Sequence, residues 1–263
     1  MTAIETTDLT KRYGSTTAVA DLNLGVPEGV VYGFLGPNGA GKTTTMRMLT
    51  SLTRPSSGNA RVAGVQVDDR DRLIDYIGYL PEEPPLYNEL TAREQLSYIA
   101  GLRDLPEERT RERVEDYLER LDLAEDADRR IDTYSKGMRQ KTAFVQSLLH
   151  DPDVLFLDEP TSGLDPRAAR TIRDMIDGLA DEGATIFLST HILPVVDEHA
   201  DTVGVLYDGE LVAEGPPADL KQRAQAGDDA GSGRTLEEVF LDVTSEDPAT
   251  ERSEAITGER PDA

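Results

Sequence analysis

The residues best suited to chemistry form a glycine-rich segment between the apolar run 30–35 and the helical pattern 43–52. This segment fits the pattern G-x-x-x-x-G-K-[ST] with Gly36, Pro37, Asn38, Gly39, Ala40, Gly41, Lys42 and Thr43. Glycines let the backbone curl so that N–H groups face phosphate oxygens, and the following helix adds the positive end of its dipole. Lys42 would then neutralise the β- and γ-phosphates, and the Thr43 hydroxyl would bind Mg²⁺. The pattern therefore predicts a nucleoside triphosphate site, because an ordinary glycine-rich turn rarely matches it.

An acidic pair follows a predicted buried strand. In VLFLDEP, four apolar residues lead to Asp158 and Glu159 at the carboxyl end of the strand, where open α/β sheets bind ligands. Asp158 is suited to hold Mg²⁺ through its hydration shell, while Glu159 polarises the attacking water. A strand that ends in Asp-Glu is, taken alone, more often a helix cap or a solvated edge. The phosphate-binding segment upstream favours hydrolysis instead.

A third segment, YSKGMRQK at 134–141, begins a predicted helix whose apolar side includes Phe144, Val145 and Leu148. Ser135 is a natural N-cap for this helix. A capped helix start that contains glycine can bind an anion through free N–H groups. A plain helix cap explains the same residues equally well.

The elements that must position these motifs alternate between strands and helices. Unalternating apolar runs at 30–35, 154–157 and 185–188 suit strands that are buried on both faces, and each run adjoins a helical pattern. The alternation predicts an α/β fold with a mainly parallel sheet. Asp208-Gly209, between two apolar segments, predicts an antiparallel hairpin within the same fold.

The chain divides into segments of different character. Residues 1–220 are predicted to form the main domain, with a helical insert over about 85–150 that is indicated by signals such as the capping box at 91–94. Residues 221–244 are predicted to form a C-terminal helical extension. The acidic segment 245–263 is predicted to be largely disordered.

The composition excludes several classes of protein. With 51 acidic and 27 basic residues, the net charge of -24 disfavours direct binding to nucleic acid or anionic lipid. Cysteine is absent and the three histidines are scattered, so neither disulfides nor a zinc site is expected. No signal peptide and no apolar stretch of roughly 20 residues is visible, so we expect a cytoplasmic chain. The acid excess and scarce lysine favour a halophile's salt-filled cytoplasm, with an ordinary acidic protein as the alternative.

These motifs, in this order, resemble the ABC transporter ATPases from about residue 4 to residue 219. The matching segments are GPNGAGKTT (Walker A), YSKGMRQK (signature), FLDEP (Walker B), Ser162-Gly163-Leu164-Asp165 (D-loop) and His191 (switch histidine). Tyr13 in KRYG matches the aromatic residue that the family stacks on adenine. The combination of IGYLPEEPPLY, the signature and LEEVFLDVT most resembles the ABC-2 subgroup, which serves small-molecule and drug exporters.

The resemblance implies a P-loop NTPase (RecA-like) core and a set of functional residues. The residues implied to bind ATP are Tyr13, Gly36, Pro37, Asn38, Gly39, Ala40, Gly41, Lys42, Thr43, Thr44, Ser135, Gly137 and Asp165. Mg²⁺ is assigned to Thr43, Asp158 and Glu82, and catalysis to Glu159, His191 and Lys42. The implied assembly is a homodimer, or a heterodimer with a related ATPase, in which one chain's P-loop faces the other chain's signature helix. It would be held at the inner face of the cell membrane by a separate transmembrane permease.

Two motifs depart from the family pattern. The usual signature is LSGGQ, and here Lys136 replaces a glycine and Met138 replaces the glutamine. The Q-loop glutamine is replaced by Glu82, or by Glu83 if the alignment shifts by one residue. A carboxylate there would bind Mg²⁺ more strongly but would also repel the γ-phosphate.

Other functions fit the sequence less well. A non-transport ABC ATPase that acts on ribosomes or DNA would normally carry a second cassette or a long coiled coil, and neither is visible. A GTPase would need an N-K-x-D motif, which is absent. An inactive interaction module would not need Lys42, Asp158, Glu159 and His191 together.

Overall fold

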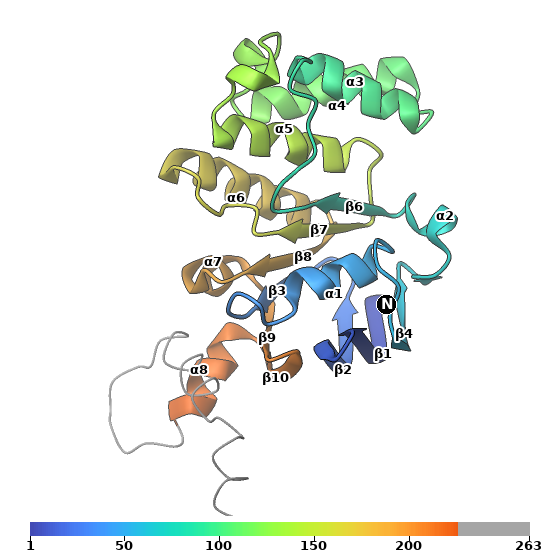
Figure 1. The fold of residues 1–263 in the computed structure, drawn as a ribbon. Coiled ribbons are helices and arrows are strands. Elements are labelled where there is room, and N and C mark those ends of the chain that lie inside the picture. The colour runs from blue at the N-terminus through green and yellow to red at the C-terminus, as the bar shows by residue number, and fades with distance from the viewer. Residues whose placement is uncertain (226–263) are drawn as a thin grey trace, which may run out of the picture.

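The computed structural model describes residues 1–225 of the chain and contains two sheets that pack around one helix (Figure 1). The larger sheet has the strand order β10-β9-β3-β8-β7-β6. Its strands are β3 (Val31–Leu35), β6 (Ile77–Leu80), β7 (Val154–Asp158), β8 (Thr185–Thr190), β9 (Thr202–Tyr207) and β10 (Glu210–Gly215). All neighbouring pairs are parallel except β9 and β10. The predicted α/β fold with a mainly parallel sheet and an antiparallel portion is confirmed.

The smaller sheet is antiparallel and has the order β2-β1-β4-β5. Its strands are β1 (Thr2–Tyr13), β2 (Thr16–Pro27), β4 (Ser57–Val62) and β5 (Val65–Gln66). Strand β1 was not predicted, because its sequence TAIETTDLTKRY is largely polar and Asp8 breaks the alternation with a positive φ of 49°. Its buried residues nonetheless join the core beneath the larger sheet.

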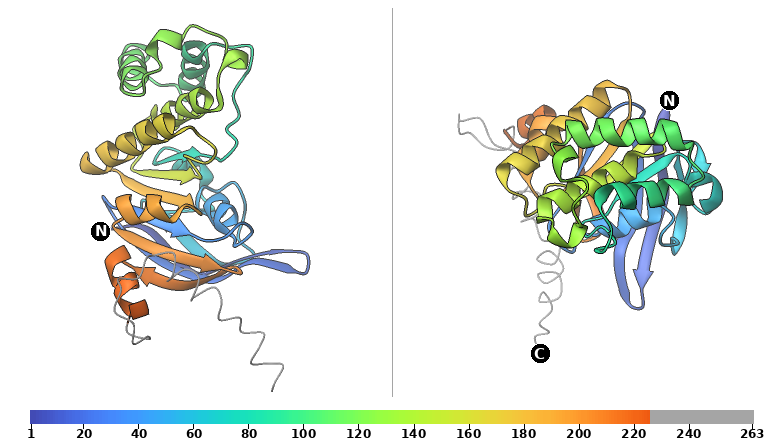
Figure 2. Two further views of the ribbon diagram at one scale, coloured as in Figure 1. Left: turned by 90° about the vertical axis from the view of Figure 1, so that its left-hand side faces the viewer. Right: turned by 90° about the horizontal axis from the view of Figure 1, so that it is seen from above.

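The helices cover the larger sheet on both faces (Figures 1 and 2). They are α1 (Lys42–Leu49), α2 (Arg70–Leu73), α3 (Ala92–Leu102), α4 (Glu107–Arg120), α5 (Lys136–Leu148), α6 (Pro166–Asp181), α7 (Leu193–His199) and α8 (Pro217–Gln225). Two single-turn 3₁₀ helices follow α4, at Ala124–Asp126 and Ile131–Thr133. The helices α3, α4 and α5 stack beyond the β6 edge of the sheet (Figure 1).

The residues 154–157 of β7 and 186–188 of β8 are apolar because both faces of these strands are buried. Leu155 and Ile186 join the core under the helices α3 to α6. Phe156 and Phe187, one position further, join the core with α1 and the smaller sheet. Successive side chains of a strand point to opposite faces, so a central strand needs apolar residues at every position. The predicted central strands are confirmed.

Local signals predicted the start of α3 and the turn between β9 and β10. The capping box of Thr91 and Glu94 is present at the start of α3, and Asp208-Gly209 connects the antiparallel pair β9 and β10. Helix α1 ends at Leu49 rather than at residue 52, because Ser51 adopts a left-handed conformation with φ 59°.

The C-terminal predictions concern residues that are mostly not described. Helix α8 covers residues 217–225. The rest of the predicted extension 221–244 and the predicted tail 245–263 lie outside the described residues.

Candidate functional site

The loop between β3 and α1 needs glycine where the backbone passes close to other strands. A Cβ atom on Gly36 would lie 2.4 Å from the carbonyl oxygen of Leu206, and one on Gly41 would lie 2.4 Å from that of Ala18. Gly41 also has a φ of 107°, a conformation that side chains disfavour. No side chain caps the N-terminus of α1 at Gly41. The first N–H groups of α1 are thus available to an anion.

This loop borders a pocket of about 290 Å³ at the carboxyl ends of the parallel strands. The lining residues are Ala18, Pro37, Asn38, Gly39, Gly41, Lys42, Thr43, Thr44, Glu82 and Glu159. The structure therefore brings the glycine-rich loop, the carboxylate predicted at the Q-loop position and the second residue of the acidic pair into one cavity.

Lys42 lies in the interior of this site, with 6% of its side chain exposed. Its ammonium donates hydrogen bonds to the carbonyl oxygens of Gly36 at 2.6 Å and Pro37 at 3.2 Å, and it lies 3.6 Å from Glu159 Oε1. The cation is thus held between the loop backbone and an acidic side chain. A phosphate group that entered the pocket would meet this charge directly.

Glu159 is fixed in position by strand β8 and the residues that follow it. Its backbone has a φ of 49°, and its N–H donates to the carbonyl oxygen of Ser189 at 3.0 Å. Its Oε2 accepts from Thr190 Oγ1 at 3.2 Å, and its Oε1 lies 2.9 Å from His191 Nδ1. A non-glycine residue with positive φ is uncommon and such strain is often stored at functional sites. The surrounding hydrogen bonds hold the carboxylate at the pocket wall.

Asp158 is buried beside Glu159, with 1% of its surface exposed. The Ser189 hydroxyl donates to its Oδ1, and within residues 1–225 it has no ion pair. Burial and the Asp158 charge raise the pKa of the neighbouring Tyr79 hydroxyl to about 12. A buried carboxylate without a cationic partner is costly, so this position fits a divalent cation with oxygen ligands.

The signature segment forms a second cluster together with the start of α6. Ser135 caps α5 by accepting a hydrogen bond from the N–H of Met138 at 3.2 Å. A Cβ atom on Gly137 would lie 3.0 Å from Ala168 Cβ, so the glycine lets the starts of α5 and α6 approach. Asp165 caps α6 by accepting from two backbone N–H groups. The N-termini of α5 and α6 therefore lie next to each other.

The comparisons with known proteins agree with this geometry. The family model described as "ABC transporter" matches residues 19–162. The chain is 42% identical over 220 residues to the daunorubicin/doxorubicin resistance ATP-binding protein DrrA of Streptomyces peucetius, covering 83% of this chain and 67% of that protein. It is 41% identical over 224 residues to the bacitracin transport ATP-binding protein BcrA of Bacillus licheniformis, covering 84% of this chain and 72% of that protein.

A solved structure adds the same fold in three dimensions. The dimeric structure of a post-hydrolysis state of the ATP-binding cassette MJ0796, bound to ADP and Pi, aligns with a TM-score of 0.74 at 25% identity and covers 81% of this chain and 98% of that one. The chain belongs to the ABC transporter family. It is an ATP-binding and ATP-hydrolysing subunit of an ABC transporter, and the predicted resemblance is confirmed. The non-transport alternative is not favoured.

The ABC subunit does not bring every predicted site residue into the pocket. Tyr13 is 49% exposed near the end of β1, under the ammonium of Lys11 at 4.9 Å, and it does not line the cavity. Ser135, Gly137 and Asp165 lie in the separate signature cluster. Ser135 and Asp165 are exposed, whereas Gly137 is buried. The roles of all these residues stay predictions.

Sequence reasoning missed two contributors to the site of this ABC subunit, Ser189 and Thr190, and one contact of the signature segment. Thr190 and Ser189 hold the two carboxylates, yet they precede His191 in an ordinary strand sequence. Lys136, treated as a departure from the pattern, lies against the D-loop: its Nζ is 2.6 Å from where a Cβ on Gly163 would stand. The available signal for Ser189 and Thr190 was that both carry a hydroxyl group at the end of a predicted strand, as the acidic pair does at the end of another.

Among the helices of residues 1–225, none combines the length and the apolarity that a bilayer crossing requires.

Proposed function

We propose that this chain hydrolyses ATP in a two-chain site and drives the export of small molecules through a separate membrane subunit. The observation that carries the proposal is the carboxylate of Glu159, which is held by Thr190 and His191 at the wall of the pocket that contains Lys42. In this proposal the backbone N–H groups at the start of α1, Lys42 and Thr43 bind the phosphates.

Glu159 is the proposed general base. It would accept a proton from a water molecule while the water oxygen forms a bond to the γ-phosphorus and the bond to the β–γ bridging oxygen breaks. The hydrogen bonds from Thr190 and His191 orient the carboxylate. Lys42, which lies 3.6 Å from Glu159 Oε1, would move its charge toward the phosphates when nucleotide enters.

Mg²⁺ is proposed as the metal. Thr43, the buried Asp158 and Glu82 offer oxygen atoms of the kind this ion prefers. When bound, Mg²⁺ supplies positive charge that offsets the charge developing on the phosphate oxygens. Glu82 in place of a glutamine adds a carboxylate to that oxygen set.

The signature cluster is proposed to complete the site of a second chain. Ser135 and Asp165 are exposed and lie outside the pocket of their own chain. The γ-phosphate of ATP would then join the P-loop of one chain to the signature helix of the other. The related cassette of known structure is dimeric with ADP and Pi, which supports the pairing. The second chain is either an identical copy or a related ATPase.

Export of small molecules and attachment to the inner face of the cell membrane are proposed from the relatives. One relative is named for daunorubicin/doxorubicin resistance and another for bacitracin transport. We propose that residues 1–220, with the helical insert 85–150, form the ATPase domain that contacts a transmembrane permease. Copurification of that permease with the tagged chain from its native membrane tests the assignment.

The decisive experiment separates binding from hydrolysis. Glu159→Gln should retain MgATP binding but lose roughly 10²- to 10⁴-fold in turnover. It should elute as a dimer on gel filtration with Mg²⁺ and ATP, and as a monomer with ADP, at a salt concentration where it is folded. The matched control, Lys42→Ala/Glu159→Gln, should stay monomeric with ATP. A Glu159→Gln variant that turns over ATP at the wild-type rate would remove Glu159 from the mechanism.

A further inference from the structure

The helix that begins at the signature segment is bonded to the polypeptide that leaves the ATP pocket. Glu82 lines that pocket, and the chain runs from it through Pro84 and Pro85 toward the helical insert (Figure 1). The side chain of Asn88 then meets Arg139, the fourth residue of α5. A short path therefore connects the ATP pocket of this chain to its own signature helix.

One amino group of Arg139 makes two hydrogen bonds. Its Nη1 donates to Asn88 Oδ1 at 2.8 Å and to the carbonyl oxygen of Ile131 at 3.0 Å. The helix dipole disfavours a cation near a helix N-terminus, and Arg139 has no ion pair within residues 1–225. These two oxygen atoms are therefore the groups that stabilise the guanidinium at this position.

The two acceptors belong to one hydrogen-bonded unit. The carbonyl oxygen of Asn88 accepts from the N–H of Asp132 at 3.0 Å, and that of Leu90 accepts from the N–H of Ile131 at 2.8 Å. The segment 88–90 is thus paired with the turn that precedes the signature. Arg139 fastens the first turn of α5 to this unit.

The bond to Ile131 also spans the signature start. Ser135, the N-cap of α5, lies between Ile131 and Arg139 in the sequence. The buried Tyr134 adds a second anchor, because its hydroxyl donates to the carbonyl oxygen of Asp126 at 2.7 Å. Side-chain bonds on both sides of Ser135 therefore fix where this residue lies.

The connection between Glu82 and Asn88 is stiff but not bonded to its surroundings. Residues 81–86 form no hydrogen bond within the described part of the chain. Pro84 and Pro85 fix φ near −65°, and a proline also restricts the residue before it to extended conformations. A displacement of Glu82 is therefore transmitted to Asn88 more than it is absorbed between them.

We propose that Arg139 is a positioning residue for ATP hydrolysis, which through Asn88 makes the position of the signature cluster depend on that of Glu82. The inference rests on the proposed function, in which Glu82 binds the metal in its own chain and Ser135 meets the ATP of the second chain. ATP in one pocket then aligns the signature cluster that completes the other pocket. The two sites of the dimer are coupled by this contact, so ATP binds to them cooperatively.

Substitutions at Asn88, which is exposed, test the contact on the full chain. Asn88→Ala removes the acceptor and should lower kcat by about threefold to tenfold, with the Hill coefficient for ATP falling toward about 1. Asn88→Asp keeps an oxygen acceptor for Arg139 and should recover most of the lost kcat. Affinity for MgADP, which reports on the chain's own pocket, should match the wild type in both variants. The control Asn23→Ala removes an exposed asparagine that bonds to Asp8 in the smaller sheet, and it should behave as the wild type does.

A second measurement separates this inference from the two-chain site itself. In the Glu159→Gln background, adding Asn88→Ala should raise the ATP concentration needed for half-maximal dimerisation on gel filtration by about threefold to tenfold. Arg139→Met should have at least as large an effect, because it loses both bonds. The combination of Asn88→Ala with Arg139→Met should be no worse than Arg139→Met alone, since the two residues act through one contact.

Several results would overturn the inference. Asn88→Ala could keep the wild-type kcat and Hill coefficient, or Asn88→Asp could be as impaired as Asn88→Ala. A loss of MgADP affinity in Asn88→Ala would mean that the substitution disturbs the chain's own pocket instead. If Glu159→Gln dimerises with ATP and Asn88→Ala changes nothing, only this inference is wrong; if Glu159→Gln stays monomeric with ATP, the two-chain site is wrong as well. Unchanged melting temperatures verify that each variant is folded.

Discussion

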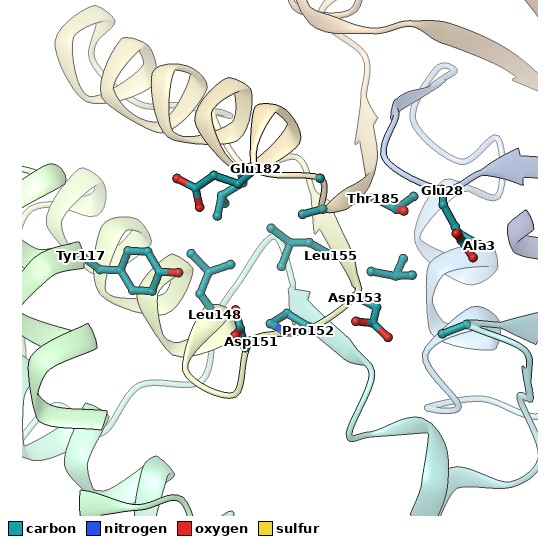
Figure 3. A pocket seen from close by; sticks show the side chains of 15 residues that line it. Ala3, Glu28, Tyr117, Leu148, Asp151, Pro152, Asp153, Leu155, Glu182 and Thr185 are labelled. Atoms are coloured by element: carbon teal, nitrogen blue, oxygen red, sulfur yellow. The ribbon is translucent and has the colours of Figure 1, made fainter. Parts of the chain in front are cut away.

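The two ends of the larger sheet have opposite electrostatic character. At the carboxyl ends of its strands, the loop after β3 offers backbone N–H groups and Lys42 to an anion. At the amino ends of β7 and β8, a pocket of about 540 Å³ is lined by the exposed carboxylates of Glu28 and Asp153 and adjoins the carboxyl ends of α5 and α6 (Figure 3). Because the strands are parallel and the crossover helices run antiparallel to them, one end of the sheet collects helix N-termini and the other collects helix C-termini. The fold thus places backbone N–H groups and Lys42 at one end of the sheet and acidic side chains at the other.

The largest expected effect comes from removing the cation at the carboxyl end. Lys42→Ala should weaken MgATP binding by about a hundredfold or more, because the phosphates lose charge-assisted hydrogen bonds of roughly 1.5 to 3 kcal/mol each. Nucleotide binding measured by calorimetry checks this. Lys221→Ala, which removes a lysine that pairs with Asp197 instead, is the control and should bind as the wild type does. If both variants bound MgATP with equal affinity, Lys42 would not be the residue that gives this end of the sheet its affinity for phosphate.

The next effect concerns the orientation of Glu159. His191→Ala should lower kcat by roughly 10- to 100-fold with little change in KM, because Glu159 Oε1 loses its 2.9 Å partner but the phosphate loop is untouched. His191→Gln should recover part of the loss, since an amide can donate to the same oxygen. Steady-state hydrolysis measured for the three proteins distinguishes these outcomes. A rise in KM alone would instead place His191 in nucleotide binding.

Salt should raise the melting temperature, because acidic residues outnumber basic ones throughout the chain. With a net charge of -24, self-repulsion falls as the Debye length shortens, and we expect the melting temperature to rise by several degrees between dilute buffer and molar KCl. A thermal melt across a KCl series measures this. A melting temperature that does not change with salt would reject adaptation to a salt-filled cytoplasm.

The smallest expected effect is at Glu82, the acidic residue on the anion side. Glu82→Gln should preserve ATP binding while shifting the Mg²⁺ concentration for half-maximal hydrolysis by a few-fold, because a carboxylate that lines the ATP pocket is lost. Glu83→Gln is the matched control, since Glu83 does not line that pocket. If only the Glu83 variant shifts the titration, the Q-loop role belongs to Glu83.

The sequence by itself predicted which residues line the candidate ATP pocket, because these residues are contiguous or come from strand ends that a parallel sheet aligns. The spacing of Gly36, Gly41 and Lys42 encodes a loop that closes on phosphate, and the apolar run before Asp158 encodes a central strand. Such local rules also predicted the Ser135 cap and the α3 capping box, both of which are present. Family, fold class and ATPase activity followed from these motifs.

Only the tertiary structure decided which distant residues hold the carboxylates of Asp158 and Glu159 and what lies at the far end of the sheet. Thr190 reaches Glu159 because β7 and β8 are neighbours, and strand order is a property of the packed sheet. The pocket at the amino ends of β7 and β8 brings together Glu28, Tyr117 and Asp153 from separate elements, and none of them stands in a motif. Their proximity results from many weak apolar contacts that are summed over the whole core, which no short pattern encodes.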